Sequence, residues 1–141
     1  MKKNTFILYL FSIILLVSCS KSSSNSPSSS NANVAGNWHG TIVATSNASA
    51  NGNWVMSLTQ NGNAVSGTIS LTTYCCTTNA LAITGTINGN SLQLAYTGGA
   101  GQANLNATIS GTSLTGTFNQ TGGVLGLASN FPSGTWQGTT P

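Results

Sequence analysis

The chain has 141 residues, among them three Lys and Arg residues in total, one His and no Asp or Glu. Without carboxylates it lacks the paired acids of most glycosidases, carboxylate ligands for Ca²⁺ or Mg²⁺, and the acid of a Ser-His-Asp triad. Without a basic patch it lacks the phosphate contacts that drive nucleic-acid binding. We therefore predict a protein that is not an enzyme, has no catalytic residues, uses no cofactor or metal, and binds no nucleic acid.

The chain opens with Lys2 and Lys3, followed by an apolar run from Phe6 to Val17. This run has twelve residues, whereas a membrane-spanning helix needs roughly 20. A basic head before a short apolar stretch is typical of a secretory signal peptide. The sequence therefore predicts export from the cytoplasm.

The segment Leu16-Val17-Ser18-Cys19 ends this stretch and resembles the lipobox of bacterial lipoproteins. The resemblance implies cleavage after a signal peptide of residues 1–18, a diacylglycerol on Cys19, and acylation of the new amine by a fatty acid such as palmitate. An ordinary cleaved signal and an uncleaved anchor are the alternatives. Several acyl chains hold a protein firmly, whereas one holds it only reversibly. We expect a lipid-anchored protein of the bacterial cell envelope, with Ser20 directing it to the outer membrane in bacteria that sort as enteric species do.

Residues 19–33 are rich in serine and contain no large hydrophobic side chain apart from the acylated cysteine. Such a composition cannot form a core, so we predict a disordered tether. A flexible coil of this length reaches about 20 Å. Lys21 is the only charged side chain that remains after cleavage. The folded domain is predicted to span residues 34–141.

The remaining sequence alternates apolar and polar residues between Asn-Gly, Gly-Gly and Ser-Gly turns. A period of two over five to eight residues indicates half-buried strands, and Asn-Gly suits the type I′ turn of a tight hairpin. No segment has the 3.6-residue period of an amphipathic helix. The predicted fold is all-β: one antiparallel up-and-down meander of about eight strands. We expect the strands at 36–45, 53–60, 63–72, 79–88, 91–98, 102–110, 113–119 and 133–139, with a short ninth near 123–128.

Four segments share the form apolar or proline, Ser/Thr, Gly-Thr, apolar, polar; their glycines are Gly67, Gly85, Gly116 and Gly134. Glycine weakens a strand unless the strand must bend or pack closely. Repeated mid-strand glycine therefore indicates curved strands. An open sheet would also leave edges without a charge to block pairing. We therefore expect the meander to close into a small barrel.

The first predicted strand carries Gly36-x-Trp38 and the last carries Gly134-x-Trp136. Gly-x-Trp on the opening strand of an eight-stranded meander resembles the calycins, the group that contains lipocalins and avidins. The resemblance implies that Trp38 packs across one closed end of the barrel. In that group an Arg or Lys of the last strand typically lies over this tryptophan, and the last strand here has neither.

Five aromatic residues share the inward phase of their strands: Trp38, Trp54, Tyr96, Phe118 and Trp136. Either they fill the core or some of them line a cavity for a small neutral or apolar ligand. We expect such ligand binding as the function. The alternative is a surface interaction or adhesion module, in which outward polar ladders meet glycan, ice or a protein partner, and a third possibility is thiol redox chemistry at Cys75 and Cys76. These ladders are Thr84, Thr86 and Asn88, and Thr115, Thr117 and Asn119.

Cys75 and Cys76 are adjacent in the sequence. After export, thiols tend to pair, but neighbouring Cα atoms lie about 3.8 Å apart, below the usual disulfide range of about 4.4–6.8 Å. Free thiols, a strained vicinal disulfide and intermolecular pairing all remain open. His39 would complete a three-ligand metal set, although the spacing is not that of a zinc site.

Overall fold

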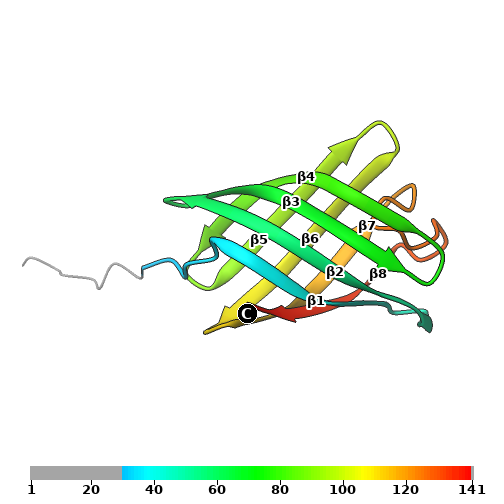
Figure 1. Cartoon of the computed structure of the whole chain (residues 1–141), viewed down its shortest axis with the longest axis horizontal. Helices are drawn as coiled ribbons and strands as arrows, with labels where there is room; N and C mark the ends of the chain where they lie inside the picture. Colours follow the sequence, from blue (N-terminus) through cyan, green and yellow to red (C-terminus); the bar gives the residue numbers. More distant parts are fainter. Residues whose placement is uncertain (1–29, 141) are drawn as a thin grey trace, which may run out of the picture.

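The computed structural model describes residues 30–140, which form a closed barrel of eight antiparallel strands. Each strand pairs with the next in the sequence, and β8 pairs with β1 to close the wall (Figure 1). The predicted all-β meander and its closure are therefore confirmed. No helix in the described part of the chain is both long and apolar enough to cross a membrane. The strands are β1 (Gly36–Ala44), β2 (Asn47–Asn61), β3 (Ala64–Thr73), β4 (Thr77–Asn88), β5 (Ser91–Gly98), β6 (Gly101–Ser110), β7 (Ser113–Gln120) and β8 (Ser133–Thr139).

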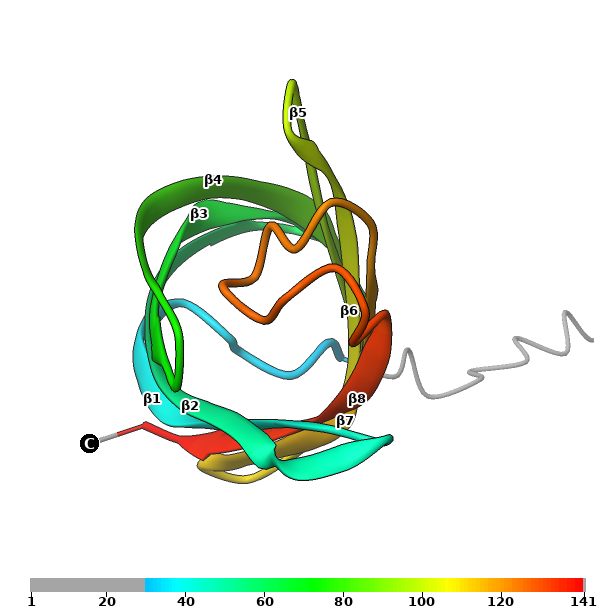
Figure 2. The ribbon, with the colours of Figure 1, turned by 90° about the vertical axis from the view of Figure 1, so that its right-hand side faces the viewer.

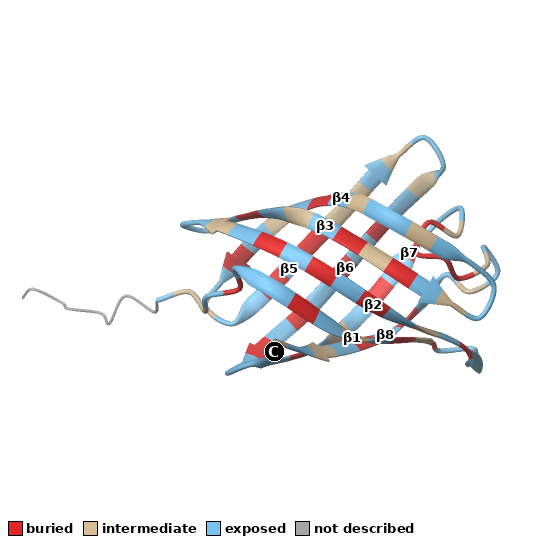
Figure 3. Cartoon of the chain, viewed as in Figure 1, coloured by how far each residue is buried: buried red, intermediate tan, exposed pale blue. Residues whose placement is uncertain are grey.

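Burial alternates along the strands, apart from an irregularity at Asn79 and Ala80 in β4, because successive side chains point to opposite faces of a sheet. Figure 3 shows the buried and exposed positions alternating around the wall. Most of the large apolar residues face one enclosed interior, whereas Val55 and the Thr, Ser and Asn residues of the strands face outward. The largest fully buried side chains are Trp38, Trp54, Trp136, Phe118, Ile42, Ile69, Leu71, Ile83, Ile87, Leu92, Leu105 and Ile109.

The two hairpin turns predicted at Asn-Gly lie where the sequence places them. Their two central residues, however, are Gly-Asn, one position later in the chain than the expected Asn-Gly. Gly62 and Gly89 take the first central position, with φ of 61° and 57°. Asn63 and Asn90 follow them and do not have positive φ. Glycine at the first central position is typical of type II′, whereas type I′ needs positive φ at both. The expected type I′ geometry is therefore wrong.

The repeated glycines face the interior, each opposite a large side chain of a neighbouring strand. Gly116 pairs with Trp136, Gly134 with Phe118, and Gly85 with Leu94. A Cβ atom at Gly134 would lie 2.7 Å from Cζ of Phe118. Small residues opposite large ones let the interior of a small barrel fill without voids.

Two expected elements differ from the structure. β2 begins at Asn47, six residues before the expected start, because Gly52 continues the strand opposite Thr73 instead of turning the chain. The ninth strand expected near 123–128 is wrong, since these residues form turns. Gly123 and Gly126 have φ of 69° and 73°, outside the β region.

Both ends of the barrel are covered by chain segments. Viewed along the axis, the β7–β8 loop lies over the near end and the segment leading into β1 crosses the far end (Figure 2). Val34 in this segment is fully buried, and its backbone N–H donates to Oε1 of Gln60 at 2.8 Å. The N–H of Ala32 donates to the carbonyl of Gly89 at 2.8 Å. Ala32 at the end of the predicted tether and Val34 directly after it therefore both pack against the barrel.

The predicted signal peptide at residues 1–18, the lipidation site Cys19 and most of the tether lie outside the described residues.

Candidate functional site

Three tryptophans occupy the interior, and each indole N–H has a backbone acceptor. Trp38 Nε1 donates to the carbonyl of Val34 at 2.9 Å, so this side chain packs at the far end as the calycin resemblance implies. Trp54 Nε1 donates to Thr41 at 3.0 Å, and Trp136 Nε1 donates to Asn106 at 3.1 Å. The rings of Trp54 and Trp136 lie 5.3 Å apart at 57°. These contacts fix the indoles as part of the core.

The two other inward aromatic residues differ in exposure. Phe118 is fully buried, whereas Tyr96 near the end of β5 is half-buried and packs at the edge of the core. The interior positions of all eight strands are therefore occupied by side chains or by glycines against which those side chains pack.

The β7–β8 loop plugs the near end of the barrel. Val124, Leu125 and Leu127 insert their side chains into the core cluster. Gln120, at the end of β7, holds the loop with its amide: Oε1 accepts the N–H of Leu125 at 2.8 Å. Its Nε2 donates to the carbonyls of Leu127 at 3.2 Å and Phe131 at 3.0 Å.

Gln120 is the one buried polar residue in the described chain, and the sequence interpretation missed it. A signal was present, since Leu114, Gly116 and Phe118 set an inward phase that Gln120 continues. A polar side chain at an inward position needs buried partners. The hydrogen-bond partners of Gln120 lie in the β7–β8 loop, whose conformation could not be predicted from the alternation of apolar and polar residues.

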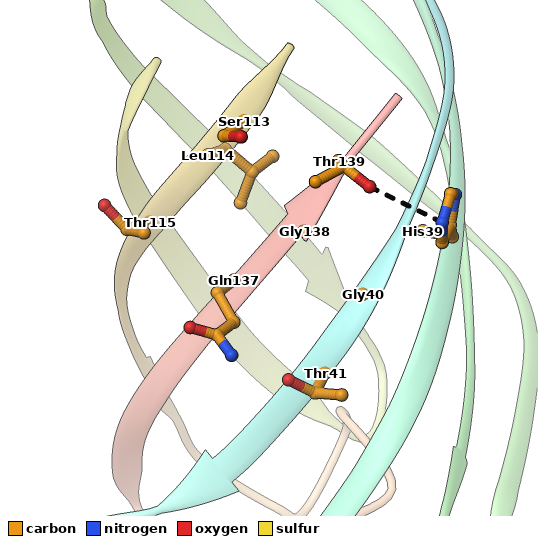
Figure 4. Close-up of a pocket in the computed structure, with 9 residues that line it drawn as sticks. All are labelled: His39, Gly40, Thr41, Ser113, Leu114, Thr115, Gln137, Gly138 and Thr139. Carbon is orange, nitrogen blue, oxygen red and sulfur yellow. Dashed lines mark hydrogen bonds between the residues drawn. The ribbon is translucent and has the colours of Figure 1, made fainter. Parts of the chain in front are cut away.

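Grooves of about 210–360 Å³ lie on the outer face of the barrel between rows of outward side chains. One groove of about 320 Å³ crosses β7, β8 and β1, with Leu114, Gly138 and Gly40 along its floor (Figure 4). Two rows of cross-strand neighbours flank the floor. They are Ser113, Thr139 and His39 on one side, and Thr115, Gln137 and Thr41 on the other.

The polar atoms of this groove are largely free to meet a ligand. Thr139 Oγ1 and His39 Nε2 lie 3.5 Å apart, at the limit of a hydrogen bond (Figure 4). The other four side chains make no side-chain hydrogen bond within residues 30–140. Elsewhere on the wall such groups do pair, for example Asn104 with Asn119 at 3.2 Å. The groove therefore presents unpaired hydroxyl and amide groups beside the weakly bonded pair of Thr139 and His39.

The two polar ladders expected from the sequence are exposed on the outer face, one on β4 and one on β7. Thr115 of the β7 ladder belongs to the groove. A parallel groove of about 340 Å³, floored by Gly116 and Trp136, lies between Thr115 and the next outward row of side chains. The β7–β8–β1 face therefore carries two polar grooves side by side.

Cys75 and Cys76 lie in the turn between β3 and β4, at the near end of the barrel, and are exposed free cysteines. The Cys75 thiol donates to the carbonyl of Gly126 in the β7–β8 loop at 2.9 Å. Its hydrogen bond with Cys76, followed by desolvation, raises the pKa of the Cys76 thiol above its ordinary value of 9.0. The vicinal disulfide and intermolecular pairing stay predictions about the oxidised protein.

His39 and the two cysteines have separate surroundings. His39 lies in the groove beside Thr139, whereas Cys75 contacts the β7–β8 loop. Among residues 30–140 no group of three or more His, Cys, Asp or Glu side chains could hold a metal ion. The sequence-based set of His39 with both cysteines is not assembled.

No protein-family model, curated protein or solved structure matches this chain. The eight-stranded antiparallel closed barrel is consistent with a calycin-like fold.

Proposed function

We propose that this chain is a lipid-anchored protein of the bacterial cell envelope that acts without catalysis, by binding a neutral glycan along the outer grooves of β7, β8 and β1. The observation that carries the proposal is the groove of Figure 4, in which six polar side chains, none of them acidic, face a site of about 320 Å³. The filled interior supports a surface site over an internal one.

The chemistry of the groove suits sugar hydroxyls. The Thr and Ser hydroxyls both donate and accept hydrogen bonds, and so does the Gln137 amide. Outward rows lie about 6.6–6.8 Å apart along a strand, and neighbouring strands lie about 4.7–4.9 Å apart. A hydroxylated ring between the rows therefore meets polar groups from both sides. Because residues 30–140 include no Asp, Glu, Lys or Arg, nothing favours a charged ligand.

The interior site expected from the calycin resemblance is less well supported. An apolar ligand would have to replace side chains that are already buried, or the β7–β8 loop would have to leave the end of the barrel. Burial of Val124, Leu125 and Leu127 opposes that movement by roughly 1.5 kcal/mol or more for each side chain. The outer face requires no rearrangement.

Membrane attachment is proposed on the lipobox-like segment Leu16–Cys19 and the serine-rich residues that follow. Metabolic labelling with an alkyne analogue of palmitate tests it directly. We expect labelling of the native chain and loss of the label in Cys19→Ala. Labelling that survives this substitution would refute attachment at Cys19.

Glycan binding is tested by titrating the mature chain, in detergent micelles, with a panel of neutral oligosaccharides. We expect Thr115→Ala combined with Gln137→Ala to weaken binding about tenfold or more, because two hydrogen bonds are lost. The matched control, Thr84→Ala with Thr86→Ala on β4, should retain native affinity. Equal loss in both variants, or no binding by the native chain, would contradict the proposal.

A further inference from the structure

The β7–β8 loop is latched to the β3–β4 turn through one atom, the carbonyl oxygen of Gly126. Cys75 Sγ donates to it at 2.9 Å, and Thr73 Oγ1 donates to it as well. The residues on either side of Gly126, Leu125 and Leu127, are almost completely buried. The latch therefore acts at the apex of the segment that plugs the barrel.

A second attachment, at the base of the loop, is of a different kind. There the Gln120 side chain is 5% exposed and bonds Leu125, Leu127 and Phe131 within the core. The Gly126 latch instead uses a thiol of an exposed residue. Of the two attachments, only the latch is open to reagents from solution.

An aromatic contact couples the same turn to the far side of the loop. The rings of Tyr74 and Phe131 meet edge to face, with centroids 6.1 Å apart. Tyr74 is 52% exposed, and it directly precedes Cys75. A change in the backbone of the turn therefore reaches the loop at Phe131 as well as at Gly126.

We propose that Cys75 and Cys76 form a reversible oxidation site that sets how firmly the β7–β8 loop closes the barrel. In the reduced state Cys75 holds Gly126 and the end is shut. In the oxidised state the sulfur is bonded to Cys76, the S–H donor is gone, and the latch is released. This modification site is independent of the glycan groove, which lies on other residues.

The reaction is thiol–disulfide exchange with an external disulfide. One cysteine thiolate attacks the oxidant to give a mixed disulfide, releasing the first oxidant thiol. The second cysteine thiolate attacks that bond, closing the Cys75–Cys76 disulfide and releasing the second oxidant thiol. The pair loses two protons and two electrons, and the oxidant gains them.

Forming the bond also requires the turn to rearrange. Adjacent Cα atoms lie about 3.8 Å apart, below the range of about 4.4–6.8 Å that most disulfides span. The turn is now held by a hydrogen bond from the N–H of Thr73 to the carbonyl of Cys76 at 2.8 Å. Rearrangement therefore alters the position of Thr73, the second donor to Gly126.

The experiment compares amide hydrogen exchange in the mature full chain, in detergent micelles, after dithiothreitol and after oxidised glutathione followed by desalting. We expect exchange at residues 124–128 to become about tenfold faster or more on oxidation, because lost hydrogen bonds lower the cost of local opening. Exchange in β5 and β6 should not change, and dithiothreitol should restore the original rates. Equal rates at 124–128 in the two states would overturn the proposal.

Two variants separate the latch from general damage to the fold. Cys76→Ser keeps the Cys75 donor and cannot form the intramolecular disulfide, so in dithiothreitol its loop should be as protected as that of the native chain. Cys75→Ala lacks the donor and should show fast exchange at 124–128 without any oxidant, with unchanged protection in β5 and β6. Slow exchange in reduced Cys75→Ala would refute the latch.

Mass spectrometry of the oxidised native chain identifies the product. A monomer 2 Da lighter than the reduced chain is expected for the intramolecular disulfide. Disulfide-linked dimers or glutathione adducts as the sole product would overturn the assignment. Glycan affinity, measured on the same samples, reports on the outer groove separately.

Discussion

Two glycines make room for the central tryptophan. Gly40 and Gly138 are cross-strand partners on β1 and β8, and both lie against the ring of Trp54. A Cβ atom would come within 2.6 Å of this ring at Gly40 and within 2.5 Å at Gly138. The same two residues form part of the floor of the outer groove. One pair of residues thus serves the core on one face and the candidate site on the other.

Gly138→Ala should lower the free energy of unfolding by about 1–3 kcal/mol, since the added methyl group overpacks the core against Trp54. Chemical denaturation of the variant and the native chain measures the difference. Gly99→Ala is the control, because a Cβ there has no neighbour within 4 Å. A Gly138→Ala variant as stable as the Gly99→Ala control would contradict the prediction, because it would mean that β8 and Trp54 can shift to accommodate the methyl group.

Most of the residue-scale description was accessible from the sequence. The period of two placed Trp38, Trp54, Phe118 and Trp136 inward, and these four are buried. The hydrogen-bond acceptors of the indole N–H groups could not be predicted from the sequence. Trp54 donates to a backbone carbonyl of the neighbouring strand β1, whereas Trp136 of β8 donates to one of β6, two strands away. Such contacts depend on barrel register, which alternation within one strand does not specify.

At the scale of elements, the β7–β8 connection is where pattern and structure diverge. Val124, Leu125 and Leu127 are apolar, which favoured a short strand. The glycines between and before them take positive φ, so the apolar side chains turn into the barrel end instead. The sequence signal for burial was correct, and the inferred backbone was not.

Gln120→Glu should convert this loop into a pH-sensitive element. The introduced carboxylate would face the carbonyls of Leu127 and Phe131, now the acceptors of the amide N–H groups. That contact disfavours the ionised form and raises the pKa of the introduced acid in the folded state. Its stability is then greatest below the unfolded pKa of about 4.3 and is lost as the pH rises through the folded value.

We expect Gln120→Glu to be less stable than the native chain by about 3 kcal/mol or more at pH 7. The deficit should shrink by at least about 1 kcal/mol at pH 3.5, because one pKa unit corresponds to 1.36 kcal/mol. Urea unfolding at both pH values measures it. Gln120→Leu cannot titrate and is the control. Its loss of stability relative to the native chain should be the same at pH 7 as at pH 3.5. A Glu variant without pH dependence would contradict the assigned contacts.

The whole domain is nearly free of groups that titrate in the acid range. Residues 30–140 contain no Asp, Glu, Lys or Arg. Acid unfolding usually protonates carboxylates that are stabilised in the native state, and none exist here. Stability therefore rests on apolar burial and hydrogen bonds, which ionic strength and pH affect little.

The melting temperature of the mature chain should be nearly constant between about pH 3 and 9. Above pH 9 it should fall, because the raised pKa of Cys76 keeps the folded thiol protonated where the unfolded chain releases the proton. Calorimetry across this range tests both parts. Cys76→Ser should reduce the alkaline decline, and a steep drop on the acid side would show that a different group controls stability.

At this scale the sequence predicted the architecture well and the closed ends poorly. Eight alternating segments joined by glycine turns require an antiparallel meander, and uncharged strand edges favour closure. The plugging of the ends involves Val34 and the β7–β8 loop, which lie outside the strands. Their burial depends on strands that are distant in the sequence, so the local pattern did not show that they cover the barrel ends. This is why the sequence favoured an internal ligand, whereas we propose an external one.

The pairing of β1 with β8 joins residues that are 100 positions apart, as His39 and Thr139 are. This seam is the last that the growing polypeptide can make. Until residues 133–139 have been synthesised, the edges of β1 and β7 have no partner strand. These edges carry no charged side chain that would oppose pairing with another chain. Folding is therefore safest when it begins only after residues 133–139 have been synthesised.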